Sequence, residues 1–294
     1  MSESPLITIA LPVYNSKRHV RQSLESLLAQ SYKDFVLIIS DNASTDGTAD
    51  ICQEYARSDS RVQYTRNKVN IGNPGNFNRL VGLTATKYIK WSTSDDYWEP
   101  TFVERALEVI DHDPSIALCY PKSWVVDGEG KNAEPYEDNL HLMQDDPAER
   151  FIGLLERIGL AHQHLGVIRT DMLRRTGLLG PYFSSDITLL AELTLYGKYY
   201  ELPERLFYRR FHETSGSWRR GDKQHQDKFY HAADRKRTGL PRWRGELGRL
   251  AAVARSPLPL KSKLRLHRYQ LRNMRWNRDM LFRELVGYAR SVTR

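Results

Sequence analysis

The stretch that decides the fold is ITIALPVYN, residues 7–15, followed at residues 41–48 by DNASTDGT. The first of these begins with a run of apolar and β-branched residues, Ile7–Val13, which predicts a strand buried on both faces. The second follows another apolar run, residues 35–39, and leads into a helix that Thr48 could cap. A buried strand that ends in a polar loop is typical of the parallel sheet of an α/β protein.

The alternation of strands and helices continues through the first hundred residues. Further strands are predicted at residues 61–65 and 88–91, and helices at residues 16–30, 49–56 and 77–83. Such alternation produces βαβ units and a mostly parallel sheet, which binds ligands at the carboxyl ends of its strands. Two acidic loops, at residues 41–48 and 95–96, each follow a predicted strand. We therefore expect them to meet at one edge of the sheet.

The second half of the chain is predicted to be less regular. Helices are expected at residues 147–158, 172–176 and 187–196, and short strands at residues 166–168, 199–202 and 206–211. Beyond residue 221 the chain is rich in Arg with spaced Leu and Trp, which predicts helices. The expected fold class is α/β, with a mostly parallel mixed sheet and a helical, basic C-terminal extension.

Charge divides the chain into two regions. Residues 222–294 contain 19 Lys and Arg and 6 Asp and Glu, a net charge of +13, whereas the rest of the chain carries −5. The basic tail leaves open the alternative of a nucleic-acid-binding protein without catalytic activity. The acidic balance of residues 1–221 argues against a nucleic-acid partner, because it would repel phosphates. No GxGxxG motif follows the first strand, which argues against a dinucleotide-dependent oxidoreductase.

Adjacent carboxylates follow the predicted strand at residues 88–91. Asp95 and Asp96 would repel each other unless a cation or hydrogen-bond donors neutralise them. A magnesium or manganese ion that bridges two phosphates needs one or two such oxygens. The alternative is a solvated acidic turn before a helix near Pro100. Asp41 ends its strand where a carboxylate can accept from a nucleobase or a ribose; the alternative is a capping turn.

The order and spacing of four segments resemble glycosyltransferase family 2. These are residues 7–15, residues 41–48, Asn70-Ile71-Gly72 and Asp95-Asp96, and the resemblance covers roughly residues 5–217. It implies a GT-A-like domain that transfers a sugar, with inversion, from a nucleotide-diphosphate sugar to an acceptor hydroxyl. It also implies a metal-dependent glycosyltransferase of the hexosyltransferase type.

The resemblance also implies a domain organisation. A catalytic domain would span residues 1–221, with a donor-binding half at about 1–122 and an acceptor-binding half at about 123–221. The basic helical extension would follow at residues 222–294.

The same resemblance implies a donor site. Pro12 and Tyr14 would line the nucleobase pocket, with Tyr14 stacked on the base, and Asp41 would bind the base or the ribose. Asp95 would lie near the ribose. Arg79 lies in a helix where the family often places a basic residue near the donor. The family usually has a second acidic residue after Asp41 and a further one before Asp95, so we expect modest metal affinity here.

Asp96 is expected to hold the divalent ion, Mn²⁺ or Mg²⁺, on the diphosphate. The closing segment at residues 208–217, YRRFHETSGS, resembles the family's Tyr-Arg-x-His…Ser pattern with one extra residue before the His. His212 would therefore bind the metal or donate to the diphosphate. Arg209 or Arg210 would balance charge on the leaving group.

Catalysis is expected from Asp186, which precedes the predicted helix at residues 187–196. The resemblance implies that it is the catalytic base, and the alternative is an ordinary helix cap. Inversion needs one carboxylate to take the proton of the attacking hydroxyl. His162, Gln163 and His164 either face the acceptor or are satisfied polar groups of a loop.

The expected partners are a nucleotide-diphosphate sugar, with a UDP-sugar favoured, and a glycan, lipid-linked or small-molecule acceptor of bacterial polysaccharide or glycoconjugate synthesis. No signal segment and no apolar run of membrane-spanning length is found, so a cytoplasmic location is expected. The Leu and Trp residues among the Arg residues of the tail suit basic amphipathic helices on the inner face of an anionic membrane. The alternative is that they pack on the catalytic domain or on a second subunit of a homodimer.

Overall fold

The sheet extends in both directions from strand β1 (Ile7–Val13), in which every residue is buried. The computed structural model describes residues 5–213 and 239–292. In it, β1 pairs in parallel with β2 (Phe35–Asp41) on one side and with β4 (Tyr88–Trp91) on the other. Strand β3 (Val62–Arg66) adds in parallel beside β2. The four strands predicted in the first hundred residues are therefore all confirmed.

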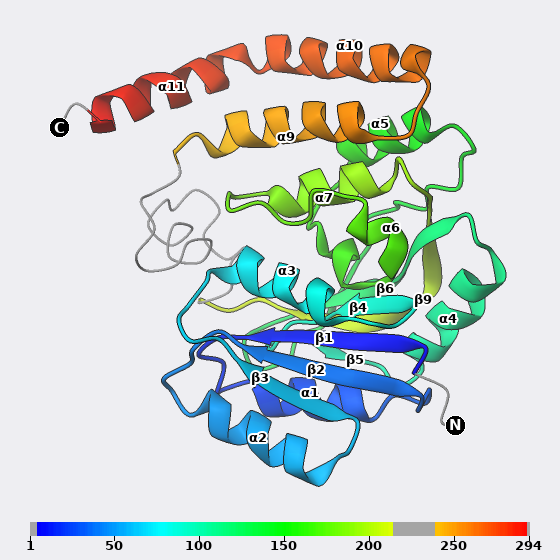
Figure 1. The fold of residues 1–294 in the computed structure, drawn as a ribbon, viewed down its shortest axis with the longest axis vertical. Coiled ribbons are helices and arrows are strands. Elements are labelled where there is room, and N and C mark those ends of the chain that lie inside the picture. Colours follow the sequence, from blue (N-terminus) through cyan, green and yellow to red (C-terminus); the bar gives the residue numbers. More distant parts are fainter. Residues whose placement is uncertain (1–4, 214–238, 293–294) are drawn as a thin grey trace.

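The direction in which strands are added reverses at β1, because the strand order is β3-β2-β1-β4. Helices α1 (Val20–Leu28) and α2 (Thr48–Ser58) cover one face of this part of the sheet, and α3 (Asn73–Leu83) covers the other (Figure 1). A reversal of this kind opens a crevice at the carboxyl ends of the two strands that flank it. The loops after β1 and β4 border this crevice.

The second half of the chain continues the same sheet with antiparallel and parallel pairs. Strand β8 (Val167–Arg169) lies antiparallel between β4 and β6 (Ile116–Val126), and β9 (Lys198–Arg210) runs parallel to β6. The short strands β5 (Tyr97–Trp98) and β7 (Glu134–Tyr136) pair with β9 and β6. The mixed α/β sheet predicted from the sequence is confirmed.

Two features of this half differ from the prediction. Strand β6 was not predicted, because Pro121, Lys122 and Ser123 interrupt its apolar pattern, yet neighbours on both sides bury most of it. The two strands expected at residues 199–202 and 206–211 are one strand, β9, which stays paired with β6 through register shifts near Lys122. Such irregularities let a long strand bend without ending.

Residues 5–213 also contain helices α4 (Phe102–His112), α5 (Pro147–Arg157), α6 (Thr170–Arg174) and α7 (Ser185–Leu193), with a 3-10 turn at His162–Leu165. Helix α5 starts where its sequence indicates, since Pro147 follows Asp146, whose carboxylate accepts from the backbone N–H of Ala148. Helix α7 starts two residues earlier than predicted, so Asp186 lies in its first turn.

The predicted division into a donor half and an acceptor half falls at residue 122, inside β6. Strands from both halves form one sheet, so the two halves share a single core. The predicted boundary at residue 221, like Thr214–Ser217 of the closing segment, lies outside the described residues. The division of the chain therefore stays a prediction.

From residue 239 on, where the structure describes it, the basic tail is helical, as predicted, and it packs on α7 and α5. Helix α9 (Pro241–Arg255) lies against α7, and α10 (Leu260–Trp276) lies on α9 and α5. Helix α11 (Arg278–Val292) continues beyond α10 (Figure 1). Val253 and Leu266 are fully buried in the common core. Among the described helices, none combines the length and the hydropathy that crossing a bilayer requires.

An ion pair fastens α9 to α7. Glu192, almost completely buried in α7, accepts two hydrogen bonds from Arg255 of α9, each 3.0 Å long. The backbone N–H of Gly177 donates a third, at 2.9 Å, to the same carboxylate. A buried carboxylate is tolerated only with partners of this kind.

We predict that Arg255→Ala destabilises the protein, because it leaves Glu192 buried without two of its three hydrogen-bond donors. The expected loss is about 1–3 kcal/mol in the free energy of unfolding, since the half-exposed Arg255 site admits some water. Urea unfolding followed by circular dichroism measures it. Arg268→Ala, at an exposed position of α10, is the matched control and should change stability by less than about 0.5 kcal/mol. Equal effects of the two variants would contradict the anchoring role.

Candidate functional site

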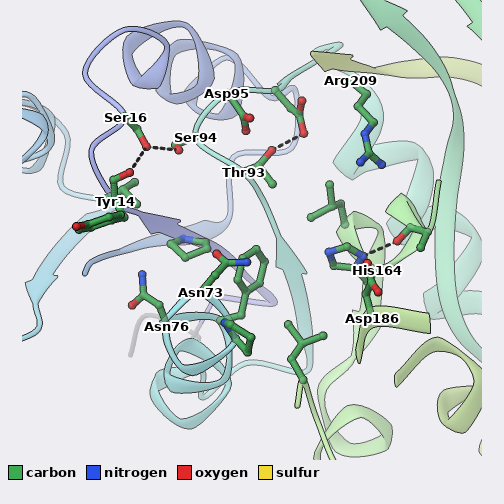
Figure 2. A pocket seen from close by; sticks show the side chains of 18 of the residues that line it. Tyr14, Ser16, Asn73, Asn76, Thr93, Ser94, Asp95, His164, Asp186 and Arg209 are labelled. Carbon is green, nitrogen blue, oxygen red and sulfur yellow. Dashed lines mark hydrogen bonds between the residues drawn. The ribbon is translucent and has the colours of Figure 1, made fainter. Parts of the chain in front are cut away.

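A cleft of about 1090 Å³ opens at the crevice between β1 and β4. Its wall comes from the loops after these two strands, the start of α3, the loop before α7 and the end of β9. Of the predicted site residues, the following line it: Pro12, Tyr14, Asp95, Asp96, Asp186, Arg209, Arg210, His164 and His212. Figure 2 shows Tyr14 on one side of this cleft and Asp186 on the other, with Asp95 at a third position near the top of the view.

The loop after β1 is held in place by the loop after β2. The backbone N–H of Asn15 donates to Ser44 Oγ at 3.0 Å, and that of Ser16 donates to Thr48 Oγ1 at 2.8 Å. In return, the side-chain oxygen of Asn15 accepts from the backbone N–H of Thr45. The polar segment at residues 41–48 thus fixes the position of Tyr14, whose ring is half exposed at the rim of the cleft.

Asp41 lies below the cleft rather than in its wall. Its carboxylate is completely buried and accepts from the backbone N–H of Ser44, the hydroxyl of Tyr64 and the guanidinium of Arg66, at 2.9, 2.8 and 2.5 Å. A nucleobase that approaches Asp41 would have to compete with Tyr64 and Arg66. The predicted contact between Asp41 and the donor stays a prediction.

Arg79 also lies outside the cleft wall. Its guanidinium donates to Ser40 Oγ and to Thr65 Oγ1, both at 3.0 Å, on the inner side of β2 and β3. Ser40 in turn donates to Asn76 Oδ1 at 2.6 Å, and Asn76 lines the cleft. Any influence of Arg79 on a donor would therefore pass through Ser40 and Asn76.

Asn42 stands where family members usually carry an acid, and the structure gives it a local task. Its amide nitrogen donates to Asn70 Oδ1 at 2.8 Å, and its oxygen accepts from Asn67 and from the backbone N–H of Ile71. These bonds hold the loop at residues 70–72 against β2. A carboxylate at this position could not donate to Asn70.

The two adjacent carboxylates after β4 face in different directions. Both oxygens of Asp96 are engaged inside the protein, one by the backbone N–H of Arg210 at 2.8 Å and the other by the hydroxyl of Thr93. Asp95 keeps part of its carboxylate exposed toward the cleft, and its Oδ2 lies 2.9 Å from His212 Nε2. The carboxylate that is more open to a ligand is therefore Asp95.

The electrostatics of this pair follow from that arrangement. Burial, followed by the negative charge of Asp95, raises the pKa of Asp96 to about 7. Burial would also raise the pKa of Asp95, but the hydrogen bond and the charge of His212 outweigh it and lower that pKa. The two carboxylates are thus shifted in opposite directions.

Two histidines lie together at the Asp95 end of the cleft. The rings of His19 and His212 are 5.1 Å apart between centroids, and both line the cleft. Burial, followed by the charge of Arg210, lowers the pKa of His19 to about 4. His19 was missed by the sequence analysis, because it lies in the turn before α1 and outside the segments that carry the resemblance.

The two arginines at the end of β9 have different environments. Arg210 is buried, and its guanidinium donates to the backbone oxygens of Asp95 and Gly128, at 2.8 and 3.0 Å, and to Gln22. Arg209 lines the cleft and donates to the backbone oxygen of Leu160 at 3.0 Å. Arg210 therefore supports the acidic loop, and Arg209 is the arginine that Figure 2 shows facing the cleft.

Asp186 lies across the cleft from Tyr14, beside His164 (Figure 2). Its Oδ1 accepts from the backbone N–H of Ile187 at 2.9 Å. His164 Nδ1 bonds the backbone oxygen of Ala161 at 2.7 Å, and burial lowers the pKa of His164 while the charge of Asp186 opposes that shift. Asp186 and His164 thus form the polar part of this side.

His162 and Gln163 do not line the cleft, although His164 does. His162 is buried and packs its Nε2 against Asp138 at 3.2 Å and Ser123 at 3.1 Å. Gln163 is completely buried. Of the three residues considered as acceptor contacts, only His164 is in a position to serve.

Much of the remaining wall on this side is apolar, Ser184 and Ser185 also line it, and one cation comes from the tail. The apolar side chains are Leu160, Leu165, Leu179, Phe183 and Ile187. Arg242, near the start of α9, also lines the cleft. Its contribution was missed, because nothing in the tail sequence shows which residue returns to the catalytic part.

Asp95 and His212 are the side chains that fit a divalent cation. They are 2.9 Å apart, belong to different elements and face the cleft. Among residues 5–213 and 239–292, no group of three or more His, Cys, Asp or Glu is placed to enclose a metal. Mg²⁺ and Mn²⁺ accept a site with one or two protein ligands when phosphate oxygens and water supply the rest. The residues therefore fit a metal that is shared with a bound diphosphate.

Comparison with solved structures shows the same fold. S. aureus TarS in complex with UDP superposes with a TM-score of 0.65 at 15% identity, over 91% of this chain and 71% of that chain. TarS with UDP-GlcNAc gives a TM-score of 0.66 at 16% identity, over 87% and 69%. The Pyrobaculum calidifontis mannosyltransferase PcManGT, in complex with GDP-Man and Mn²⁺, gives 0.59 at 15% identity, over 98% and 76%. The GT-A-like fold predicted from the sequence is confirmed.

Sequence comparison finds bacterial glycosyltransferases. Chondroitin synthase of Escherichia coli is 36% identical over 126 residues, which is 43% of this chain and 18% of that protein. The E. coli protein WfaP, a UDP-Glc:alpha-D-GlcNAc-diphosphoundecaprenol beta-1,3-glucosyltransferase, is 33% identical over 106 residues, 36% of this chain and 41% of WfaP. The chain spans half or less of the length of the relatives it matches first.

The model of the family described as "Glycosyl transferase family 2" matches residues 8–177, more than half of the chain. This range contains β1, the acidic loop after β4 and the fixed loops between them. The fold, the relatives and the matched range agree, and the protein belongs to glycosyl transferase family 2.

Proposed function

We propose that the protein transfers a sugar from a nucleotide-diphosphate sugar to an acceptor hydroxyl, with inversion. The observation that carries this proposal is one cleft that joins Tyr14, the Asp95–His212 pair and Asp186. The nucleotides named in the TarS and PcManGT complexes support a nucleotide-sugar donor, and those of TarS favour a UDP-sugar. Family membership decides against the alternative of a non-catalytic nucleic-acid-binding protein.

The donor would lie along the β1–β4 side of the cleft. Tyr14 offers an exposed ring on which a base can stack, next to Pro12. Asp95 and His212 would hold a divalent cation, and its charge would stabilise the leaving diphosphate. This assignment differs from the predicted one, in which Asp96 holds the metal, because Asp96 is already engaged by Thr93 and Arg210. With two protein ligands, we expect modest metal affinity.

The acceptor would enter from the side of α7. Asp186 would take the proton of the acceptor hydroxyl while the oxygen of that hydroxyl forms a bond to the anomeric carbon. On the opposite face of that carbon the bond to the diphosphate oxygen breaks, and the diphosphate leaves with the electron pair. Figure 2 shows Asp186 well apart from Asp95, and this proposal needs such a separation because the base and the leaving diphosphate act on opposite faces of the carbon.

The wall near Asp186 supports an acceptor that carries both apolar and anionic groups. Leu160 and Phe183 offer apolar contact, and Arg242 offers a cation. A lipid-linked glycan has this chemistry, and the acceptor in the name of WfaP is of that kind. We place the enzyme in bacterial polysaccharide or glycoconjugate synthesis, at the cytoplasmic face of the membrane.

We predict that Asp186→Asn lowers sugar transfer by about 10²–10⁴-fold while donor binding persists, because the amide keeps the shape and cannot accept the proton. Turnover of a UDP-sugar with an acceptor extract, and UDP binding by calorimetry, measure the two effects. Asp171→Asn, at an exposed carboxylate in the first turn of α6, is the matched control and should leave both unchanged. Near-normal turnover of Asp186→Asn would remove Asp186 as the base.

We predict that Asp95→Asn lowers the affinity for UDP in the presence of Mn²⁺ and that Asp96→Asn does not. Asp95→Asn should weaken UDP binding in the presence of Mn²⁺ by at least about tenfold, because a neutral amide is a poor ligand for a hard cation. Asp96→Asn should keep that affinity within about threefold, since the amide oxygen can accept from the Arg210 N–H and the amide nitrogen can donate to the hydroxyl oxygen of Thr93. Calorimetry with and without Mn²⁺ measures the difference. A larger loss of affinity in Asp96→Asn than in Asp95→Asn would identify Asp96 as the metal ligand instead.

A further inference from the structure

The outer face of α10 carries a stripe of exposed leucines. Leu260, Leu264 and Leu271 are 72%, 55% and 57% exposed. Their spacing of four and seven residues places them in one line along the helix, whereas Leu266 and Tyr269 are buried on the opposite face. Figure 1 shows α10 as the layer farthest from the sheet, with α9 between it and α7. The inner face therefore accounts for the packing of the tail, and the outer stripe remains to be explained.

Positive charge accompanies this stripe. Helix α10 contains six Lys and Arg residues and no Asp or Glu. At about 100° per residue, the basic side chains that border the leucines are Lys261, Arg268 and Arg275, all of them exposed. Trp276 follows at the end of the helix and is 88% exposed. An apolar line bordered by cations is typical of helices that lie in a membrane interface.

We propose that the outer face of α10, defined by Leu260, Leu264, Leu271 and the bordering basic residues, binds the surface of an anionic lipid bilayer. The leucines would enter the headgroup region, and the cations would face acidic lipids. A second copy of the chain is a poorer occupant, because a two-fold contact would bring identical arrays of cations together. A nucleic acid would use the cations and leave the leucines exposed to water.

The placement of the tail links this surface to the acceptor. Helix α9 lies between α10 and α7, carries Arg242 into the cleft and is fastened to Glu192 by Arg255. A bilayer on the outer face of α10 would hold the acceptor end of the cleft at a fixed height above the lipid. The link to a lipid-linked acceptor rests on the proposed function, whereas the membrane contact itself does not.

The experiment is co-sedimentation of the full chain with vesicles of phosphatidylglycerol and phosphatidylcholine, and with vesicles of phosphatidylcholine alone. We expect binding to the anionic vesicles that falls at high salt. Leu264→Ser with Leu271→Ser should weaken it about tenfold or more, because apolar insertion is lost. Replacing Lys261, Arg268 and Arg275 by Gln should weaken it about fivefold for each charge. The full chain is needed, because truncation would uncover Val253 and Leu266.

A matched control replaces Lys33, Arg57 and Lys131, exposed cations of the catalytic part, by Gln and should leave vesicle binding almost unchanged. Thermal unfolding and UDP calorimetry without lipid verify that each variant is folded. If the unaltered protein does not bind UDP, that result would count against the proposed function and not against the membrane contact. Absence of binding to anionic vesicles at low salt, or binding that none of the α10 variants weakens, would overturn the membrane proposal. So would a lipid-free dimer, seen by light scattering, that the leucine variants dissociate.

Discussion

The parallel pairing of β2, β1 and β4 is the constraint on which the site depends. Val13 lies opposite Asp41, and Ala10 lies opposite Trp91, so the three strands end at one edge of the sheet. Because β1 is buried along its whole length between β2 and β4, a shift in its register would disturb its pairing with both strands and the close packing of its side chains. The loops that follow these strands therefore lie close together, and hydrogen bonds between the loops after β1 and β2 hold this wall of the cleft in place.

Arg210 adds a second constraint, which gives the adjacent carboxylates of Asp95 and Asp96 different environments. Its backbone N–H donates a hydrogen bond to one carboxylate oxygen of Asp96, and its guanidinium donates one to the backbone oxygen of Asp95. The loop is thereby pinned with Asp96 turned inward and Asp95 turned toward the cleft. The charges of Asp95 and Asp96 would repel each other if both carboxylates faced the cleft as ligands. Here one serves as a structural acceptor, and the other stays available beside His212.

The sequence predicted the parallel strands well, because their apolar runs depend only on local burial. It did not predict β6, whose polar centre around Lys122 is held in the sheet by pairing with strands that are distant in the chain. It placed Asp41 in the donor site, but could not show that the β2–β3 register sets Arg66 directly opposite Asp41. Asp186 was predicted through the family resemblance, and the structure shows only that it lines the cleft. The contribution of Arg242 requires knowing how the tail folds back.

The start of α9 depends on a helix that comes much later in the chain. Glu284 of α11 accepts from the backbone N–H groups of Arg242 and Trp243, both at 3.2 Å, and Trp243 Nε1 donates to the backbone oxygen of Leu281. The groups that orient Arg242 at the cleft are therefore synthesised after the rest of the cleft wall. A nascent chain on the ribosome can complete the donor side once β9 and His212 have emerged, because Arg210 and His212 contact the acidic loop. It can complete the acceptor side only after α11 has emerged, so the two sides of one cleft are finished at different times during translation.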